Sequence, residues 1–207
     1  MTNSNLKLSL LNENDIGIIQ KIWHKSLPYN LKSIIGQKLI KKYLLKYFKR
    51  EKNLAFGLYE TNKIVGFVLF GNDKNIFNDL FKENFFFIIK SFLANFIKFK
   101  IKNLVRYFNV FIYTIFFKSK EKNLGKNICE LIIIAIEPDK KNRGYGSFML
   151  KNCFDKFYNY FSEFDFIFVK TLKTTPENIS FYKKNKFEFL YEIFGRVYLK
   201  LKVLKNY

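Results

Sequence analysis

The sequence predicts an α/β fold, of the α+β kind, in a single domain over residues 1–207 that carries a helical insertion. Residues 5–11 alternate apolar and polar side chains, which is typical of a half-buried strand. Residues 131–136 form a continuous apolar run that ends before Pro138, as expected of a strand buried on both faces. Residues 72–125 hold a dense Phe and Ile series with many basic residues, and they predict two or three inserted helices.

The segment before the insertion predicts two helices and a hairpin after the first strand. Polar residues 12–15 have the character of a helix start, and Pro28 separates the two helices. A short polar turn, Glu60-Thr61-Asn62, separates two apolar runs and indicates a β-hairpin. The elements expected here are helices over 16–26 and 31–50 and strands over 54–59 and 63–70.

The segment after the insertion predicts a regular alternation of strands and helices. A glycine loop follows the buried strand, Pro176 stands near the start of a short helix, and Gly195 marks the turn of a closing hairpin. The elements expected after residues 131–136 are a helix over 145–161, a strand over 164–171, a helix over 176–185 and strands over 187–193 and 196–203.

The formal net charge of +20 raises the hypotheses of a nucleic-acid partner and of an anionic membrane surface. Only four of the 37 basic residues are arginines, whereas sites that read nucleic-acid sequence usually rely on arginine. The abundance of Lys, Asn, Ile, Phe and Tyr also fits a bias toward A/T-rich codons. We therefore expect no nucleic-acid partner. The longest uncharged run of the insertion, residues 107–117, is too short to span a bilayer, so amphipathic helices are expected there.

The cysteine and histidine content limits the chemistry. Two cysteines, Cys129 and Cys153, form no disulfide framework, and the N-terminus has no signal-peptide pattern, so we expect the reducing environment of the cytoplasm. One histidine and two scattered cysteines do not make a usual zinc set, so no metal is expected.

The glycine loop is the strongest chemical signal. Lys141-Asn142-Arg143-Gly144-Tyr145-Gly146 follows a buried strand and a proline and precedes a helix. The start of such a helix offers unpaired backbone N–H groups and a positive dipole end, and the glycines allow a close approach of the backbone. With the nearby lysines and Arg143, this arrangement suits a diphosphate. The loop has neither the third glycine of a dinucleotide-binding fingerprint nor the Gly-Lys-Ser/Thr of a P-loop.

This stretch resembles the acetyl-CoA binding motif of the GNAT superfamily of N-acetyltransferases, Gln/Arg-x-x-Gly-x-Gly/Ala after the fourth strand. Lys141 stands where the family usually has Gln or Arg, which keeps the charge. A second stretch, residues 176–187, resembles the late motif of the family, in which an Asn precedes Phe-Tyr and a Gly-Phe pair. Here Asn178 is closer than usual to Tyr182, and Lys186 replaces the glycine.

The resemblance implies a mixed, mostly antiparallel sheet of about six or seven strands flanked by helices. It also implies direct transfer of an acetyl group from acetyl-CoA to a primary amine. Tyr182 would act as general acid toward the leaving thiolate, and its ordinary pKa near 10 suits that role. The residues expected to bind acetyl-CoA are Ile134, Ala135 and Ile136 along the pantetheine, Lys141, Asn142, Arg143, Gly144, Tyr145, Gly146 and Ser147 around the diphosphate, and Asn178.

The general base is an open question at this level. Glu130 matches the glutamate that acts as base in the histone acetyltransferases of the superfamily, and it is equally well read as a solvent-facing residue at a strand edge. Glu60 and His24 are more remote candidates. A packed aromatic residue is the alternative reading of Tyr182 in a chain that is 20% aromatic.

The insertion and the acceptor leave several hypotheses. The insertion lies between the third and fourth strands, where the family usually has a tight turn, and it could cover the acceptor site, form a homodimer surface or enlarged core, or contact a membrane surface. An amino sugar or its nucleotide conjugate is the expected small-molecule acceptor, because the basic stretches suit an anionic molecule. Protein or peptide amines, and a non-catalytic module that binds acyl-CoA, are the alternatives.

Overall fold

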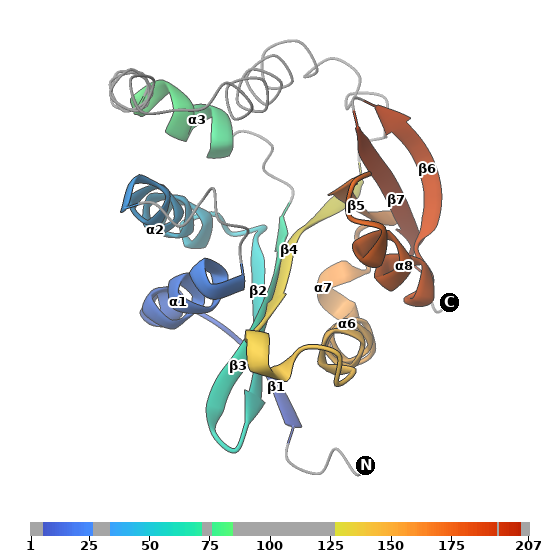
Figure 1. Cartoon of the computed structure of the whole chain (residues 1–207), viewed down its shortest axis with the longest axis horizontal. Helices are drawn as coiled ribbons and strands as arrows, with labels where there is room; N and C mark the ends of the chain where they lie inside the picture. Colours follow the sequence, from blue (N-terminus) through green and yellow to red (C-terminus); the bar gives the residue numbers. More distant parts are fainter. Residues whose placement is uncertain (1–5, 27–33, 72–75, 85–126, 194, 204–207) are drawn as a thin grey trace. The chain divides into compact units, whose positions relative to one another are not determined.

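The computed structural model describes residues 6–26, 34–71, 76–84, 127–193 and 195–203 (Figure 1). The chain divides into two compact units, Met1–Ile76 with Asn127–Tyr207, and Phe77–Lys126. The helix α3 (Ile76–Glu83) belongs to the smaller unit from Phe77 onward and is described up to Asn84, whose side-chain amide donates to the Leu80 carbonyl. The other helices expected within 85–125, and the start of the helix expected from residue 31, lie outside the described residues.

The larger unit is built on one seven-stranded mixed sheet in the order β1-β2-β3-β4-β5-β7-β6, which confirms the predicted fold class. All neighbouring strands run antiparallel except β4 and β5, which pair in parallel. The strands are β1 (Leu6–Leu10), β2 (Leu54–Glu60), β3 (Lys63–Gly71), β4 (Ile128–Ile136), β5 (Phe166–Leu172), β6 (Glu188–Ile193) and β7 (Arg196–Lys202).

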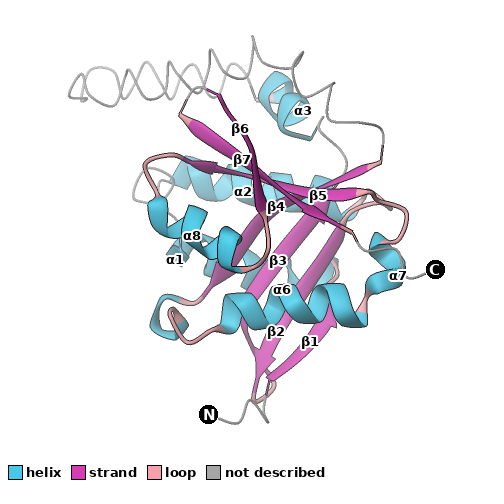
Figure 2. Cartoon of the chain, turned by 90° about the vertical axis from the view of Figure 1, so that its right-hand side faces the viewer, coloured by secondary structure: helices cyan, strands magenta, loops and turns pink. Residues whose placement is uncertain are grey.

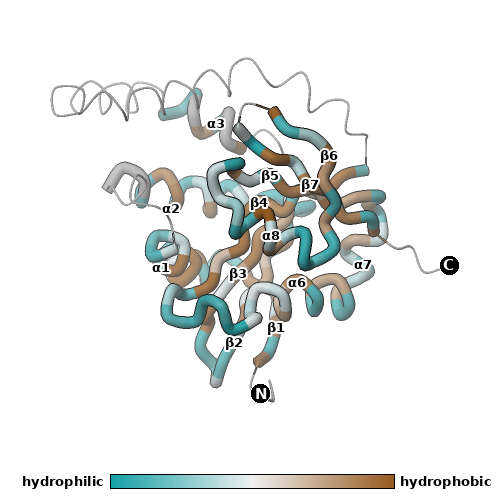
Figure 3. Tube along the Cα trace, turned by 45° about the vertical axis from the view of Figure 1, so that its right-hand side comes forward, coloured by the Kyte–Doolittle hydropathy of each residue, from teal (hydrophilic) through white to brown (hydrophobic). Residues whose placement is uncertain are grey.

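Helices cover both faces of the β1–β4 part of this sheet (Figures 1 and 2). On one face lie α1 (Ile16–Ser26) and α2 (Ile34–Phe48), and on the other lies α6 (Tyr145–Lys156). The Trp23 ring of α1 lies 6.0 Å from the Phe67 ring of β3. The Tyr47 hydroxyl of α2 donates to the carbonyls of Leu54 and Phe70, at 2.6 Å each. Because β3 and β4 are covered on both sides, they are nearly all apolar and largely brown in Figure 3.

The core under α6 is continuous from β1 to β7. Met149, Leu150 and Cys153 of α6 pack in one buried cluster with Cys129 and Leu131 of β4. The same cluster includes Tyr182 and Phe187, from the helix α8 (Pro176–Lys184) and the turn after it. The elements that carry the predicted motifs are therefore anchored in one core.

Most element boundaries agree with the prediction to within about two residues, and the larger differences concern the helix after the glycine loop and the start of β4. The helix expected over 145–161 ends at Lys156 and resumes as the single turn α7 (Tyr158–Phe161), because Phe157 between them leaves helical geometry at φ −119° and ψ 28°. β4 begins at Ile128 rather than at 131, because Ile128–Glu130 is the part of β4 that pairs with β5. The helix expected over 31–50 ends at Phe48, and it is described from Ile34 onward.

Candidate active site at the opening between β4 and β5

β4 and β5 pair only at their starts. Ile128–Glu130 pairs with Phe166–Phe168, and within the described sheet β4 has no partner on this side from Leu131 to Ile136. On its other side β4 stays paired with β3 as far as Ile136. Apart from the Ile136 carbonyl, which accepts from Ser26, the peptide groups of β4 that face β5 are therefore available to an extended ligand that carries amides of its own. The predicted residues Ile134, Ala135 and Ile136 line this stretch.

A β-bulge lies at the start of the opening. Leu69 of β3 is opposite Ile133, and the next residue, Phe70, is opposite Leu131, so Ile132 is an extra residue in β4. A bulge bends its strand and redirects the peptide groups beside it. Here it coincides with the point where β4 separates from β5.

The glycine loop brings backbone N–H groups to the far end of the opening. α6 begins at Tyr145, its N-cap Gly144 has φ 80° and ψ 0°, and no side chain of the described residues caps it. The first amide bonded to the N-cap carbonyl is that of Phe148, which donates to Gly144 at 2.9 Å. The amides of Tyr145, Gly146 and Ser147 therefore precede the helical hydrogen bonds, and the exposed Lys141 and Arg143 lie nearby in the chain. This end of α6 is suited to bind an anion.

The backbone geometry at Asn142 and Gly144 explains why the loop carries these two residue types. Asn142 adopts φ 62° and Gly144 φ 80°, both in the left-handed region. Glycine and asparagine are the residues that enter this region at the lowest cost. The loop sequence is thus selected by its backbone geometry.

Glu60 connects to both ends of this loop. Its carboxylate accepts a hydrogen bond from the Tyr145 hydroxyl and forms an ion pair of 2.6 Å with Lys140 Nζ. The hydrogen bonds from Lys140 and Tyr145 lower the pKa of Glu60, and the Glu60 carboxylate raises the pKa of both partners. The sequence offers Glu60 only as a remote candidate base, and nothing in the local sequence indicates this contact.

α8 packs directly against the start of α6. A Cβ atom added at Gly146 would lie 3.1 Å from the Phe181 ring, so glycine allows this close approach. Asn185 donates to Ser147 Oγ at 3.0 Å. The predicted Asn178, in contrast, is exposed and lies near Thr171 Oγ1 of β5, at 3.5 Å. Asn185 is therefore the asparagine that reaches the start of α6, and only its position within the late motif could have indicated this.

Tyr182 is held in place by the end of α8. The Phe187 amide donates to the Tyr182 carbonyl and the Lys186 amide to the Lys183 carbonyl, at 3.0 Å each. This is the Schellman pattern of a helix C-terminus, and its left-handed residue is Lys186 at φ 68°. The Tyr182 and Phe187 rings pack 5.6 Å apart. Lys186 thus adopts the geometry for which the family uses glycine.

Burial raises the pKa of Tyr182 to about 12. The side chain is 8% exposed, and its hydroxyl forms no hydrogen bond with another residue of the described part of the chain. A phenol in this setting keeps its proton at neutral pH and has its donor capacity free.

Glu130 lies on the face of β4 opposite α6. Its neighbours Cys129 and Leu131 belong to the core under α6, so the alternation of a strand turns Glu130 to the other face. Its carboxylate forms an ion pair of 2.9 Å with Lys170 Nζ of β5, with 15% of the Glu130 side chain exposed. Glu130 therefore lies where the pairing of β4 and β5 ends, and it is not a solvent-facing residue at an open edge.

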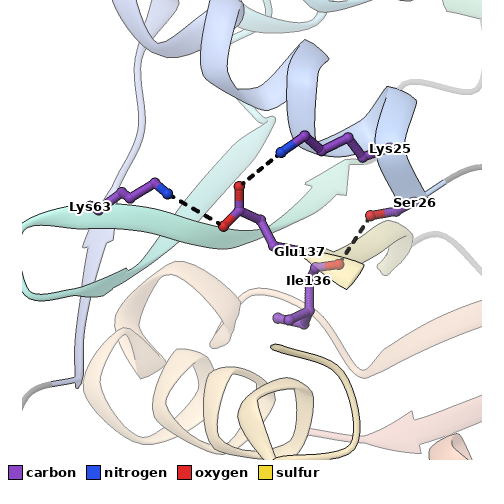
Figure 4. A network of polar contacts seen from close by, with 5 residues as sticks. All are labelled: Lys25, Ser26, Lys63, Ile136 and Glu137. Atoms are coloured by element: carbon purple, nitrogen blue, oxygen red, sulfur yellow. Dashed lines mark hydrogen bonds and ion pairs between the residues drawn. The ribbon is translucent and has the colours of Figure 1, made fainter. Parts of the chain in front are cut away.

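A second carboxylate lies beyond the other end of β4 (Figure 4). Glu137, with 6% of its side chain exposed, lies 3.5 Å from Lys25 Nζ and 3.8 Å from Lys63 Nζ. Beside it, the Ser26 hydroxyl donates to the Ile136 carbonyl at 3.0 Å. These contacts hold the end of α1 against the end of β4. The Nε2 atom of His24, the other remote candidate base, lies 3.1 Å from Gln37 Nε2.

Other chemistries find little support in the described residues. Burial raises the thiol pKa of Cys129 and Cys153, the two cysteines of the chain, so neither is suited to carry an acyl group. Within the ranges that the structure describes, no three His, Cys, Asp or Glu residues come together as a metal site. The described helices include none that is both long and apolar enough to cross a membrane.

A family model decides what this site belongs to. The model described as the acetyltransferase (GNAT) family matches residues 19–187, which include both motifs. The chain is a member of the GNAT acetyltransferase family. A sequence comparison with curated proteins gives no match.

Solved GNAT structures share the fold at low sequence identity. The chain is similar to PaiA N-acetyltransferase from Thermoplasma acidophilum, solved with coenzyme A, at 12% identity and a TM-score of 0.60, covering 98% of this chain and 99% of that one. It is similar to the ribosomal-protein-S18-alanine N-acetyltransferase from Escherichia coli, at 12% identity, a TM-score of 0.56 and coverage of 96% and 94%. It is also similar to spermidine N-acetyltransferase from Vibrio cholerae, at 12% identity and a TM-score of 0.56, covering 98% of this chain and 95% of that one. At these identities the likeness concerns the fold alone.

Proposed function

We propose that this GNAT protein transfers the acetyl group of acetyl-CoA directly to a primary amine. The observation that supports this most is the combination of an unpaired β4 edge with an uncapped α6 N-terminus at its end. Pantetheine carries amides that can pair with a strand edge, and the diphosphate of CoA is the anion that a helix N-terminus binds well. The β4 edge from Ile134 to Ile136 would hold the first, and the amides from Asn142 to Ser147 would hold the second.

The proposed chemistry needs no acyl-enzyme. The neutral amine nitrogen attacks the thioester carbonyl carbon, and the carbon–sulfur bond breaks as the amide forms. Tyr182 donates its proton to the departing thiolate, and Glu130 accepts the proton that the amine loses, directly or through water. Two features support this assignment: the free hydroxyl of Tyr182, and the position of Glu130 on the α1 face of β4 at the start of the opening.

We propose an acceptor that carries negative charge besides its amine, such as an amino sugar linked to a nucleotide. Lys25, Lys63 and Lys170 lie on the α1 side of β4 and would favour such a molecule. A protein or peptide amine is the second candidate. It is favoured by the local match of Glu130 and of Arg143-Gly144-Tyr145-Gly146 to the histone acetyltransferases. We further propose one domain with an insertion at 72–125, acting in the cytoplasm.

A thiol-release assay with a panel of amines tests the function. The purified protein is incubated with acetyl-CoA and with amino sugars, their nucleotide conjugates, polyamines or peptides. The masses of the products are then measured by mass spectrometry. We expect free thiol and an acceptor heavier by one acetyl group, with the largest kcat/KM for the anionic amines. Preference for peptides would support the second candidate. Thiol release without an acetylated amine would contradict the proposed function.

A further inference from the structure

The Glu60 carboxylate bridges the two ends of the glycine loop. One oxygen pairs with Lys140 Nζ at 2.6 Å, immediately before the loop, and the other accepts from the Tyr145 hydroxyl, immediately after it. Residues 141–144, between these two contacts, are all exposed. We call Glu60, Lys140 and Tyr145 the Glu60 bridge.

The residues inside the bridge adopt a backbone geometry that their own types do not fix. Asn142 and Gly144 both have positive φ. Glycine and asparagine enter and leave the left-handed region readily, so contacts from outside the loop are needed to keep it in one conformation. Fixing both ends of a short loop also removes much of its conformational freedom before a ligand arrives. The bridge is therefore well placed to preorganise the loop.

The base of the bridge is itself rigid. Glu60 is the last residue of β2 and pairs with Leu6 of β1 and Lys63 of β3. The turn that follows, at Thr61 and Asn62, has positive φ at both residues, as in the tightest hairpins. Through Glu60, the glycine loop is therefore tied to a fixed point of the sheet, although the two are far apart in the sequence.

We propose that Glu60 is a positioning residue for acetyl-CoA, which acts through Lys140 and Tyr145 to hold the amides at the start of α6 in the geometry that binds the diphosphate. This inference rests on the proposed function. A positioning role would account for the presence of a carboxylate beside a site that binds an anion. Without such a role, a negative charge close to Lys141 and Arg143 would only weaken the binding of a diphosphate.

A positioning role and simple electrostatics predict opposite changes in the affinity for acetyl-CoA in the variant Glu60→Gln. Removing the charge leaves Lys140 free and makes the site more positive, which by itself would strengthen acetyl-CoA binding. Loss of the bridge would instead release the loop. If Glu60 positions the loop, the Kd for acetyl-CoA rises roughly tenfold, the effect of losing one charge-assisted interaction.

The experiment compares three proteins by calorimetry with acetyl-CoA and by steady-state kinetics. Glu192→Gln is the matched control, because Glu192 forms an exposed ion pair with Lys173 at 2.9 Å on β6, away from the loop. For Glu60→Gln we expect a higher Kd and KM for acetyl-CoA with kcat within about twofold, whereas Glu192→Gln behaves as wild type. A loss of kcat at unchanged KM would indicate a merely structural role and overturn the proposal.

Tyr145→Phe supplies an independent variant. It removes only the hydroxyl that donates to Glu60, and we expect a higher Kd that is not additive with that of Glu60→Gln. An unchanged or lower Kd in Glu60→Gln would overturn the inference while leaving the proposed function intact. Absence of acetyl-CoA binding by the wild-type protein would instead contradict the proposed function itself.

Discussion

The two sides of β4 are built differently. On the side of α6, the proposed acetyl-CoA site consists of backbone groups, left-handed residues and close helix contacts, all within residues 128–187. On the side of α1, charged side chains from distant segments meet. Glu130 pairs with Lys170, and Glu137 lies near Lys25 and Lys63. The α6 side is suited to a ligand that stays the same between related proteins, and the α1 side to one that differs between them. The reason is that side chains are substituted more readily than backbone geometry is altered.

The largest expected effect comes from Tyr182→Phe. The change removes only a hydroxyl that has no partner among the described residues, so the fold and acetyl-CoA binding should be retained. Loss of the general acid should lower kcat by about 1,000-fold, within the range for proton transfer by a positioned side chain. Steady-state kinetics and calorimetry check this together. Unchanged kcat would show that the thiolate leaves without help from Tyr182.

Glu130→Gln tests the α1 side. If Glu130 accepts the proton of the amine, kcat should fall by about 100-fold at neutral pH. Lys170→Gln is the matched control, since it breaks the same ion pair and keeps the carboxylate. A role for the ion pair alone in holding β4 and β5 together would lower kcat equally in both variants.

Lys186→Gly tests the geometry that positions Tyr182. Because Lys186 adopts φ 68°, glycine should raise the free energy of unfolding by about 1 kcal/mol and leave kcat unchanged. Lys184→Gly, at the last helical position of α8, should lower it by up to about 1 kcal/mol. Urea unfolding measures both. Equal losses in the two variants would argue against the left-handed conformation.

The smallest effect expected is on the pH profile. Burial raises the pKa of Tyr182 to about 12, so kcat should show no alkaline decline from this residue up to about pH 10.5. Since this folded pKa lies above the unfolded value near 10, the buried phenol contributes its full stability below pH 10 and loses it as the pH rises through 12. The difference in tyrosine absorbance between wild type and Tyr182→Phe would give the ionisation of Tyr182 itself. A Tyr182 midpoint near 10 would contradict its burial.

The sequence predicted the parts of the molecule that depend on local patterns. The seven strands, the glycine loop and the start of the helix after it follow from apolar periodicity and from glycine geometry, and their structural counterparts agree. The Glu60 contacts could not be predicted, because Glu60 and Tyr145 are 85 positions apart and nothing local specifies their approach. The contact of Asn185 with Ser147 could not be predicted either, because it depends on how the end of α8 packs against α6, and Asn178 stays a prediction for acetyl-CoA binding.

Calorimetric titration of Ser147→Asp with acetyl-CoA tests the central claim, that the start of α6 holds the diphosphate, most directly. An acidic residue in the first turn of a helix favours the helix, so the fold should be retained while the diphosphate is repelled. Ser147→Asn, equal in size and uncharged, is the control. We predict that the wild-type protein and the Asn variant bind acetyl-CoA and that the Asp variant binds at least about tenfold more weakly. Equal binding by the two variants, or no binding by the wild type, would contradict the account.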